Sequence, residues 1–414
     1  MTDRASAAVE QAWQQEWGRL LGLLVGRFRD VDLAEDALAD AFEAATRTWP
    51  TDGVPSNPAA WLLTTARRRA LDKLRGADTA RRKLPLLVVD HLREEERGEV
   101  DIDDVGDDEL KLLFLACHPA LAPESQAALA LRLVLGIPTA EIARLFLVTE
   151  PTMAARITRA KKKIATAGLP FAMPDDGALG DRVEVAAQAI YLCFTAGYAP
   201  GFGDAVVRAD LAGEAIRLAR LLVRLLERRG ERAPGVVALL ALMMLQHSRR
   251  DARVSADGEL VLLADQDRSA WHHDEISEGL ALLASVPATT GRAEELRVQA
   301  VIAARHATAV HPDGTDWSAI AADYARLEQL TGSPVVRLNR AVAVAEADGP
   351  RAGLALLDGL DEVLPLSHRL PAVRGELLVR AGEVDAARAA LQVAIERCQH
   401  EVELTYLRNR LASL

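Results

Sequence analysis

Residues 139–164 read TAEIARLFLVTEPTMAARITRAKKKI, a pattern of apolar residues that predicts two helices joined by a short break. The break falls at Leu147-Val148. Thr149 is suited to cap the second helix, and Pro151 is accepted in a first helical turn. The stretch therefore predicts a helix-turn-helix.

The second of these helices has two different sides. Met153, Ile157 and Ala160 form its apolar side. The side chains expected to face outward are Thr152, Arg156, Arg159 and Lys163. In a helix-turn-helix the second helix enters a DNA major groove, with its first residues near base edges and its later cations near phosphates. The pattern favours DNA binding, and the alternative is a solvated basic surface.

Length and net charge limit the number of domains and the extent of any nucleic-acid contact. A chain of 414 residues, half of them hydrophobic, predicts two to four folded domains. The net charge of −11 confines any nucleic-acid contact to local patches. Residues 61–83 carry a balance of +6, and residues 84–110 carry −9. This reversal predicts an acidic linker over residues 86–106, between domains at 1–85 and 107–170, with a further domain at 171–414.

Three cysteines share no metal or disulfide spacing, which suits a reducing cytoplasm. The first 17 residues lack the apolar core of a signal peptide, and the longest apolar run, residues 235–245, is too short to cross a bilayer. We expect a cytoplasmic protein with no membrane contact, no metal and no cofactor.

An acidic stripe marks residues 32–43. Apolar side chains occupy one side of this predicted helix, and acids recur on the other side at Asp32, Asp36, Asp40 and Glu43. Like charges four residues apart repel one another, so a stripe of one sign favours a basic partner. The alternative is plain solvation of the stripe.

The next predicted helix starts near Asn57-Pro58 and runs to Arg75. Its expected buried seam consists of Leu62, Ala66, Ala70 and Leu74. Its other side consists of Trp61, Thr65, Arg68, Asp72 and Arg75. This mixture of aromatic, hydroxyl and cationic groups suits phosphates and unstacked bases. For Trp61 the core is the alternative to a stacking surface.

The order of acidic helix, basic helix, acidic linker and helix-turn-helix resembles sigma-70-type RNA polymerase sigma factors of the extracytoplasmic-function class, which keep only regions two and four. The resemblance covers about residues 10–168. It implies that Glu35-Asp36 and the aromatic Phe42 belong to the helix that docks on the beta-prime clamp helices of core polymerase.

The family's minus-ten pattern falls on Trp61, Leu62, Ala66, Arg67, Asp72 and Arg75. Its region-four pattern falls on Glu141, Ile142, Ala143, Thr152, Arg156, Arg159 and Ala160. The resemblance thus implies minus-ten recognition by the first set and minus-thirty-five recognition by the second. It also implies promoter DNA and core RNA polymerase, with its beta-prime clamp helices and beta flap, as partners. Ala39, Arg68 and Ala155 depart from the family's usual glutamine, asparagine and serine.

Residues 171–414 predict a separate helical domain. Gly382, Ala387, Leu391 and Ala394 repeat the small and large residues of tetratricopeptide helix pairs, and a weaker copy surrounds Gly349. The whole chain resembles the sigma-factor subgroup with a tetratricopeptide-like extension. The expected fold is all-α, with at most one short β-hairpin at Asp257-Gly258.

A polar part of this domain suggests a regulatory pocket built from Arg249, Arg250, Asp251, Asp265, Asp267 and Arg268. The alternative, which we favour, is an internal salt-bridge network. Residues 272–275 read HHDE, but adjacent residues on a helix point to different sides, so we expect no metal there.

The chain contains no phosphate loop, nucleophile elbow or metal-spaced cluster, so we expect no catalytic activity. The sequence thus predicts a sigma factor that binds core polymerase and directs promoter-specific initiation. Its C-terminal domain is expected to control that activity in cis, by contact with the sigma domains. Two alternatives remain at this point: a helix-turn-helix regulator without sigma activity, and an unrecognised enzyme in the C-terminal domain.

Overall fold

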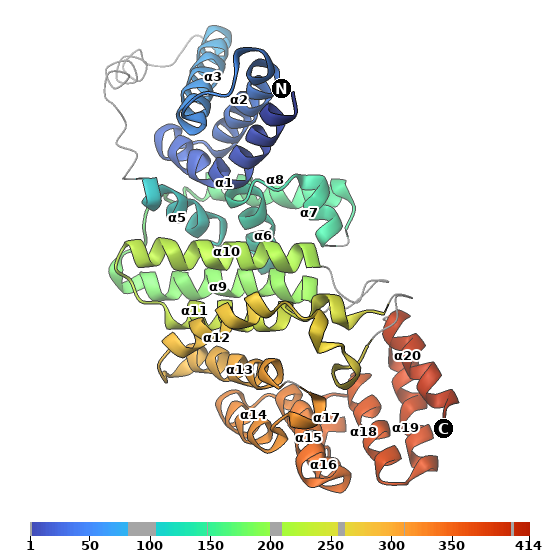
Figure 1. Ribbon diagram of the computed structural model, residues 1–414. Helices are drawn as coiled ribbons and strands as arrows, with labels where there is room; N and C mark the ends of the chain where they lie inside the picture. The colour runs from blue at the N-terminus through green and yellow to red at the C-terminus, as the bar shows by residue number, and fades with distance from the viewer. Residues whose placement is uncertain are drawn as a thin grey trace. The chain divides into compact units, whose positions relative to one another are not determined.

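The computed structural model describes residues 2–81, 105–146, 148–198, 209–255, 261–309, 311–398 and 401–414. Over these residues the protein consists of helices and contains no strand (Figure 1), which confirms the predicted all-α class. The chain divides into two compact units. The first comprises Met1–Leu192 and Arg224–Glu231, and the second comprises Cys193–Val223 and Arg232–Leu414.

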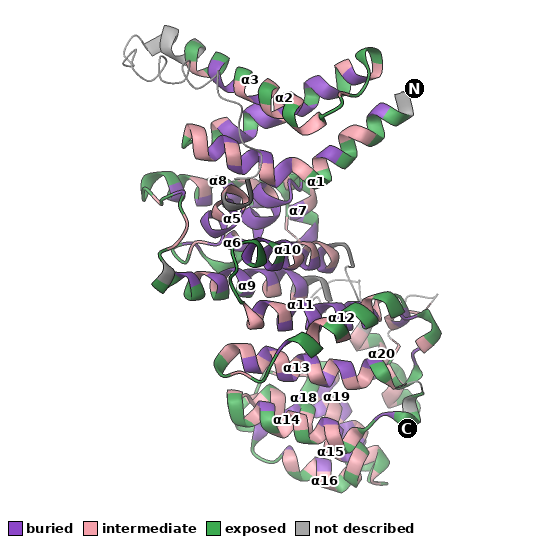
Figure 2. Cartoon of the chain, turned by 60° about the vertical axis from the view of Figure 1, so that its left-hand side comes forward, coloured by how far each residue is buried: buried purple, intermediate pink, exposed green. Residues whose placement is uncertain are grey.

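The first unit begins with a bundle of three helices: α1 (Thr2–Phe28), α2 (Val31–Asp52) and α3 (Pro58–Arg81). Local signals set their ends. Asp30 caps α2 by accepting from the backbone of Leu33, and Asn57 accepts from Ala60 at the start of α3. Buried and exposed residues alternate along α1 and α2 (Figure 2), as amphipathic helices require.

A second group of helices follows in the same unit: α5 (Val105–Ala116), α6 (Pro123–Leu129), the π-helix η3 (Ala130–Val134), α7 (Thr139–Leu145) and α8 (Glu150–Thr166). The predicted helix-turn-helix therefore exists as α7 and α8. Thr149 caps α8, as expected, by accepting from the backbone of Thr152 at 3.4 Å. Leu147 and most of the predicted acidic linker lie outside the described residues.

Two further helices start in one unit and end in the other: α9 (Asp176–Tyr198) and α10 (Ala209–Arg228). Within the first unit, Arg182 of α9 donates to the carbonyl of Phe114 and lies 5.9 Å from the centre of that ring. The boundaries predicted for the domains stay a prediction.

The rest of the second unit is a series of helices coloured yellow to red in Figure 1. They are α11 (Pro234–His247), α12 (His273–Ser285), α13 (Gly291–Thr308), α14 (Trp317–Thr331), α15 (Pro334–Asp348), α16 (Pro350–Leu356), α17 (Leu360–Val363), α18 (Arg369–Arg380), α19 (Val384–Arg397) and α20 (Glu401–Ala412). Short 3-10 turns lie at Arg250–Arg253, Leu263–Asp265, Arg268–Ala270 and Pro312–Gly314.

The repeat predicted around Gly382 is a packed helix pair. Ala387, Leu391 and Ala394 of α19 are fully buried, and a side chain at Gly375 of α18 would collide with Leu391. The weaker copy around Gly349 is also a helix pair, formed by α15 and α16. The turn expected at Asp257-Gly258 lies outside the described residues.

A buried carboxylate joins two helices of this unit. The side chain of Glu294 on α13 is 2% exposed and accepts two 2.8 Å hydrogen bonds from Arg297. It also pairs with Arg326 of α14 and accepts from the backbone of Thr289 at 3.0 Å. The hydrogen bonds from Arg297 outweigh burial and lower the pKa of Glu294 to about 2.

Candidate nucleic-acid and partner interfaces

The predicted recognition helix α8 has the two sides that its sequence indicates. Met153, Ile157 and Ala160 are buried, together with Ile164. Of the predicted outward residues, Thr152, Arg159 and Lys163 are exposed and Arg156 is half-buried. Lys163 donates to the carbonyl of Ala120 in the turn that precedes α6. The basic side of α8 is thus presented at the surface, and DNA contact by these four residues stays a prediction.

On α3 the expected seam is largely correct, since Leu62, Ala66 and Ala70 are fully buried. Trp61 is half-buried and packs edge-to-face on Trp49 of α2, with ring centres 5.6 Å apart. The aromatic ring of Trp61 therefore has one side in the bundle and one side near solvent.

The other predicted residues of this helix lie at two depths. Arg68, Asp72 and Arg75 are exposed, and Thr65 is half-buried. Arg67 is half-buried as well, and burial followed by the charge of Arg27 lowers its pKa. The exposed side of α3 therefore keeps the cationic character that phosphate contact needs.

The acidic stripe of α2 has a central pair of aspartates and one exposed acid at each end. Asp36 and Asp40 both face Lys73 of α3, at 3.8 and 3.0 Å. Asp32 and Glu43 are exposed at the two ends, with side-chain exposures of 74% and 68%. Salt bridges as exposed as those to Lys73 contribute little to stability, so Asp36 and Asp40 remain available to a partner.

Phe42 lies in the aromatic core of the bundle. Its ring packs edge-to-face on Trp13 at 4.8 Å and lies 5.9 Å from Trp17. Because Phe42 is only 2% exposed, it supports the acidic helix from beneath and does not itself face a partner.

Glu35, which the family resemblance assigns to the docking helix beside the stripe, is only 5% exposed. Its carboxylate pairs with Arg132 of η3 and with Lys161 of α8, the latter at 2.5 Å. Lys161 also reaches Asp32 at 2.8 Å. Burial opposes the charge of Lys161, but the two carboxylates, Glu35 foremost, outweigh burial and raise the pKa of this lysine.

The sequence pattern singled out neither Arg132 nor Lys161. Each lies about a hundred residues or more from Glu35 in the chain, and Lys161 is the first of three consecutive lysines. No local signal distinguishes Lys161 from its two neighbours. The role of Lys161 therefore follows from a tertiary contact, which helical periodicity cannot predict.

Glu109 of α5 is a second perturbed acid in the first unit. Burial raises its pKa to about 7, against the opposing charges of Arg224, Arg19 and Arg228; Glu16 adds to the rise. A carboxyl group placed in this way titrates near neutral pH.

Two residues of the predicted regulatory pocket pair with groups at the N-terminal end of α12. Arg250 binds Glu275 of α12 at 2.9 and 3.0 Å, and Asp251 lies 2.7 Å from His272. These contacts fit the internal salt-bridge network that we favoured.

The remaining four residues make other contacts. Arg268 and Arg249 stack on Trp271, at 4.6 and 5.9 Å from its ring, and Trp271 is 3% exposed. Asp267 accepts from Ser269 and is exposed, as is Asp265. A ligand-binding role for this group stays a prediction.

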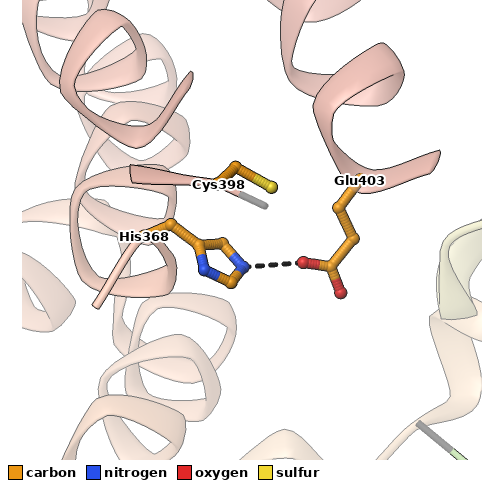
Figure 3. Close-up of side chains that lie close together, drawn as sticks. All are labelled: His368, Cys398 and Glu403. Carbon is orange, nitrogen blue, oxygen red and sulfur yellow. Dashed lines mark hydrogen bonds and ion pairs between the residues drawn. The ribbon is translucent and has the colours of Figure 1, made fainter. Parts of the chain in front are cut away.

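Within the described residues, His368, Cys398 and Glu403 form a group with metal-ligand chemistry (Figure 3). Their ligand atoms lie within 4.8 Å of one another, and Nε2 of His368 is 2.7 Å from the carboxylate of Glu403. Zinc bonds of 2.0–2.3 Å hold ligand atoms roughly 3.3–3.8 Å apart. The spacing of up to 4.8 Å between these ligand atoms is wider than a bound zinc ion requires. The hydrogen bond between His368 and Glu403 instead joins the start of α18 to α20.

Comparisons with known proteins match three parts of the chain to family models. Residues 13–79 match sigma-70 region 2, residues 111–164 match sigma-70 region 4, and residues 182–286 match a family of unknown function, DUF6596. Among the described residues, no helix combines the length and apolar character needed to cross a membrane.

An uncharacterized protein of Rhizobium meliloti is 43% identical over 95% of this chain and 93% of its own length. The "Probable ECF RNA polymerase sigma factor SigI" of Mycobacterium tuberculosis is 27% identical over 38% of this chain. The matched part spans 54% of SigI, about half of its length. The chain therefore belongs to the sigma-70 family, as a sigma factor of the extracytoplasmic-function type that carries a C-terminal extension.

Proposed function

We propose that this sigma factor binds core RNA polymerase in the cytoplasm and directs it to promoters through three surfaces of its first unit. The exposed acids of α2 dock on the basic beta-prime clamp helices. The cationic side of α3 contacts the minus-ten element, and Trp61 stacks on a base once the duplex opens. The basic side of α8 reads the minus-thirty-five element while region 4 contacts the beta flap.

One observation supports this proposal above the others. Asp36 and Asp40 stand together on the exposed side of α2, and both pair with Lys73, whose side chain is 39% exposed. A partner cation can displace so exposed a lysine at little cost, since exposed salt bridges contribute up to about 1 kcal/mol. Opposite charges across an interface also raise the association rate.

Charge reversal tests this surface. The double variant Asp36→Lys and Asp40→Lys should lose co-purification with core polymerase, because two lysines would face a basic clamp. Glu10→Lys is the control, since it adds positive charge at an exposed position of α1 outside the stripe. Polymerase association equal to that of the control would refute the assignment of α2.

We also propose that the C-terminal extension controls sigma activity in cis, and that it has no catalytic role. The first unit includes residues 224–231, so a chain ending at Glu231 keeps every segment of that unit. A gain of transcription by this shortened chain would mean that residues 232–414 mask the sigma regions. A loss with intact folding would mean that they brace those regions. Unchanged transcription would refute control in cis.

A further inference from the structure

Two arginines of the second unit lie over the ring of Trp271. The guanidinium carbon of Arg268 is 4.6 Å from the ring centre, and that of Arg249 is 5.9 Å from it. Trp271 itself is 3% exposed and packs in an apolar cluster with Leu245 and Ile276. Both arginines are half-buried, so two positive charges meet at the border between this cluster and solvent.

The guanidinium group of Arg268 has an unused edge. Its Nη1 donates to the carbonyls of His306 and Ala309, at 2.8 and 2.6 Å, where α13 ends. Among the described residues these carbonyls are its only hydrogen-bond acceptors, and its Nε is buried without a partner. Nε and Nη2 together form the edge on which a guanidinium group binds two oxygens of a carboxylate or phosphate. That edge of Arg268 therefore lacks its usual partner.

The surroundings of the two arginines are electrostatically positive. Burial, followed by the charge of Arg249, lowers the pKa of Arg268. Burial also lowers the pKa of His306 to about 4, and the charges of Arg249 and Arg268 add to this fall. No carboxylate in the described part of the chain opposes either shift. Positive charge of this kind attracts an anion.

The acids that are close in sequence have other positions or partners. Asp267 accepts hydrogen bonds from the backbone and hydroxyl of Ser269, at 2.9 and 2.7 Å. Asp265 is exposed, and its charge acts on Tyr406 of α20. Neither acid forms an ion pair with Arg268 within the described residues.

Two buried polar atoms beside the arginines also lack partners. They are Nε1 of Trp271, on the ring that both guanidinium groups cover, and Nδ1 of His306. The imidazole of His306 packs edge-to-face on Trp317, at 5.3 Å. Folded proteins pair nearly all buried polar atoms, so unpaired ones call for an explanation such as a bound ion. The indole N–H is a donor and therefore suits an anion.

We propose that Arg249 and Arg268 bind an oxyanion beside Trp271, the carboxylate or phosphate group of a small molecule. The free edge of Arg268 donates to two oxygens of the anion, and Arg249 supplies the second positive charge. The C-terminal extension then carries a ligand site of its own. This inference does not depend on the proposed sigma function, and its test uses neither polymerase nor DNA.

Fluorine NMR of the full chain labelled with fluorotryptophan tests the site at pH 7. The chain contains six tryptophans, and Trp271→Phe identifies the signal of Trp271. Inorganic phosphate and acetate are the two probes, and sodium chloride at equal ionic strength is the reference. We expect the Trp271 signal to shift saturably with an oxyanion and not with chloride. A shift with phosphate alone assigns a phosphate ligand, and a shift with acetate alone assigns a carboxylate.

Three variants show whether the arginines cause the shift. Arg249→Gln removes one charge, and Arg268→Lys keeps the charge but removes the two-pronged edge. Each should raise the oxyanion concentration at half-saturation about tenfold or more, since a charge-assisted hydrogen bond is lost. Arg292→Gln is the control, because Arg292 pairs with Glu295 on α13 and should leave the half-saturation point unchanged.

Two results would overturn the site. The first is the absence of a saturable shift of the Trp271 signal with either probe. The second is the same half-saturation point in wild type, Arg249→Gln and Arg268→Lys, which would make the shift a general effect of salt. Circular dichroism checks that each variant keeps its helices. Arg249→Gln keeps the test decisive if Arg268→Lys does not fold, because Arg268 also holds the end of α13.

Discussion

Replacing Lys161 by methionine isolates the contribution of the Glu35 pair to the stability of the first unit. Methionine keeps much of the volume and removes the charge. Removing one partner of a fully buried pair costs about 3–5 kcal/mol, because the other charge is left uncompensated in the interior. Glu35 keeps Arg132, which shares its carboxylate, so we expect about half of this cost, roughly 2 kcal/mol.

Lys73→Met is the matched control. Lys73 also holds two carboxylates, but its side chain is 39% exposed against 14% for Lys161. Exposed pairs contribute up to about 1 kcal/mol and weaken in salt. We therefore expect Lys73→Met to lower the free energy of unfolding by less than half as much as Lys161→Met does. Of the two variants, only Lys73→Met should have an effect that shrinks markedly when sodium chloride is raised.

The measurement is urea unfolding, monitored through labels attached to α3 and α8, which reports on the first unit alone. Adding Glu35→Gln to Lys161→Met should recover part of the loss, with a coupling free energy of about 1–2 kcal/mol, because no unpaired carboxylate then remains. The reasoning would be refuted if the Lys161 and Lys73 variants lost equal unfolding free energy. It would also be refuted if the effects of Lys161→Met and Glu35→Gln were additive in the double-mutant cycle.

Four further outcomes are expected. Arg156→Ala and Arg159→Ala should each weaken duplex binding and reduce the slope of log affinity against log salt by about one, as titrations at several salt concentrations would show. Trp61→Ala should leave duplex binding intact and impair promoter opening; a normal permanganate footprint at the minus-ten element would make Trp61 a core residue only. Because the folded pKa of Glu109, about 7, exceeds its ordinary 4.5, the free energy of unfolding should fall as pH rises between these values, and Glu109→Gln should flatten that dependence. The pKa of Glu294, about 2, lies below 4.5, so its stabilisation is present above pH 4.5 and lost as pH falls towards 2; Glu294→Gln should cost about 3 kcal/mol at pH 7 in thermal unfolding.

Local patterns were enough to predict the helices that carry the sigma surfaces. The seam of Leu62, Ala66 and Ala70 and the cap at Thr149 follow from residues within a few turns of one another. The tetratricopeptide-like pair at Gly382 followed for the same reason, since small residues at fixed spacing set how closely two adjacent helices pack.

Contacts between distant segments were not predictable in this way. The family resemblance placed Glu35 in the docking helix, but no local pattern shows that Arg132 and Lys161 of region 4 cover its carboxylate. Gly18, Gly22 and Gly26 recur every four residues along α1, but this spacing does not indicate which segments pack against the glycines. The contacts of the charged group at Arg249–Arg268 were not predictable for a similar reason, since opposite charges close in sequence indicate pairing without telling which groups pair.

Run-off transcription tests the central claim most directly. Core polymerase, the full-length chain and DNA from upstream of its own gene should together give a discrete transcript that core alone does not produce. The Asp36→Lys and Asp40→Lys variant should give none, although it should still bind the duplex. A chain that binds this DNA yet yields no transcript with core polymerase would contradict the account and favour a helix-turn-helix regulator.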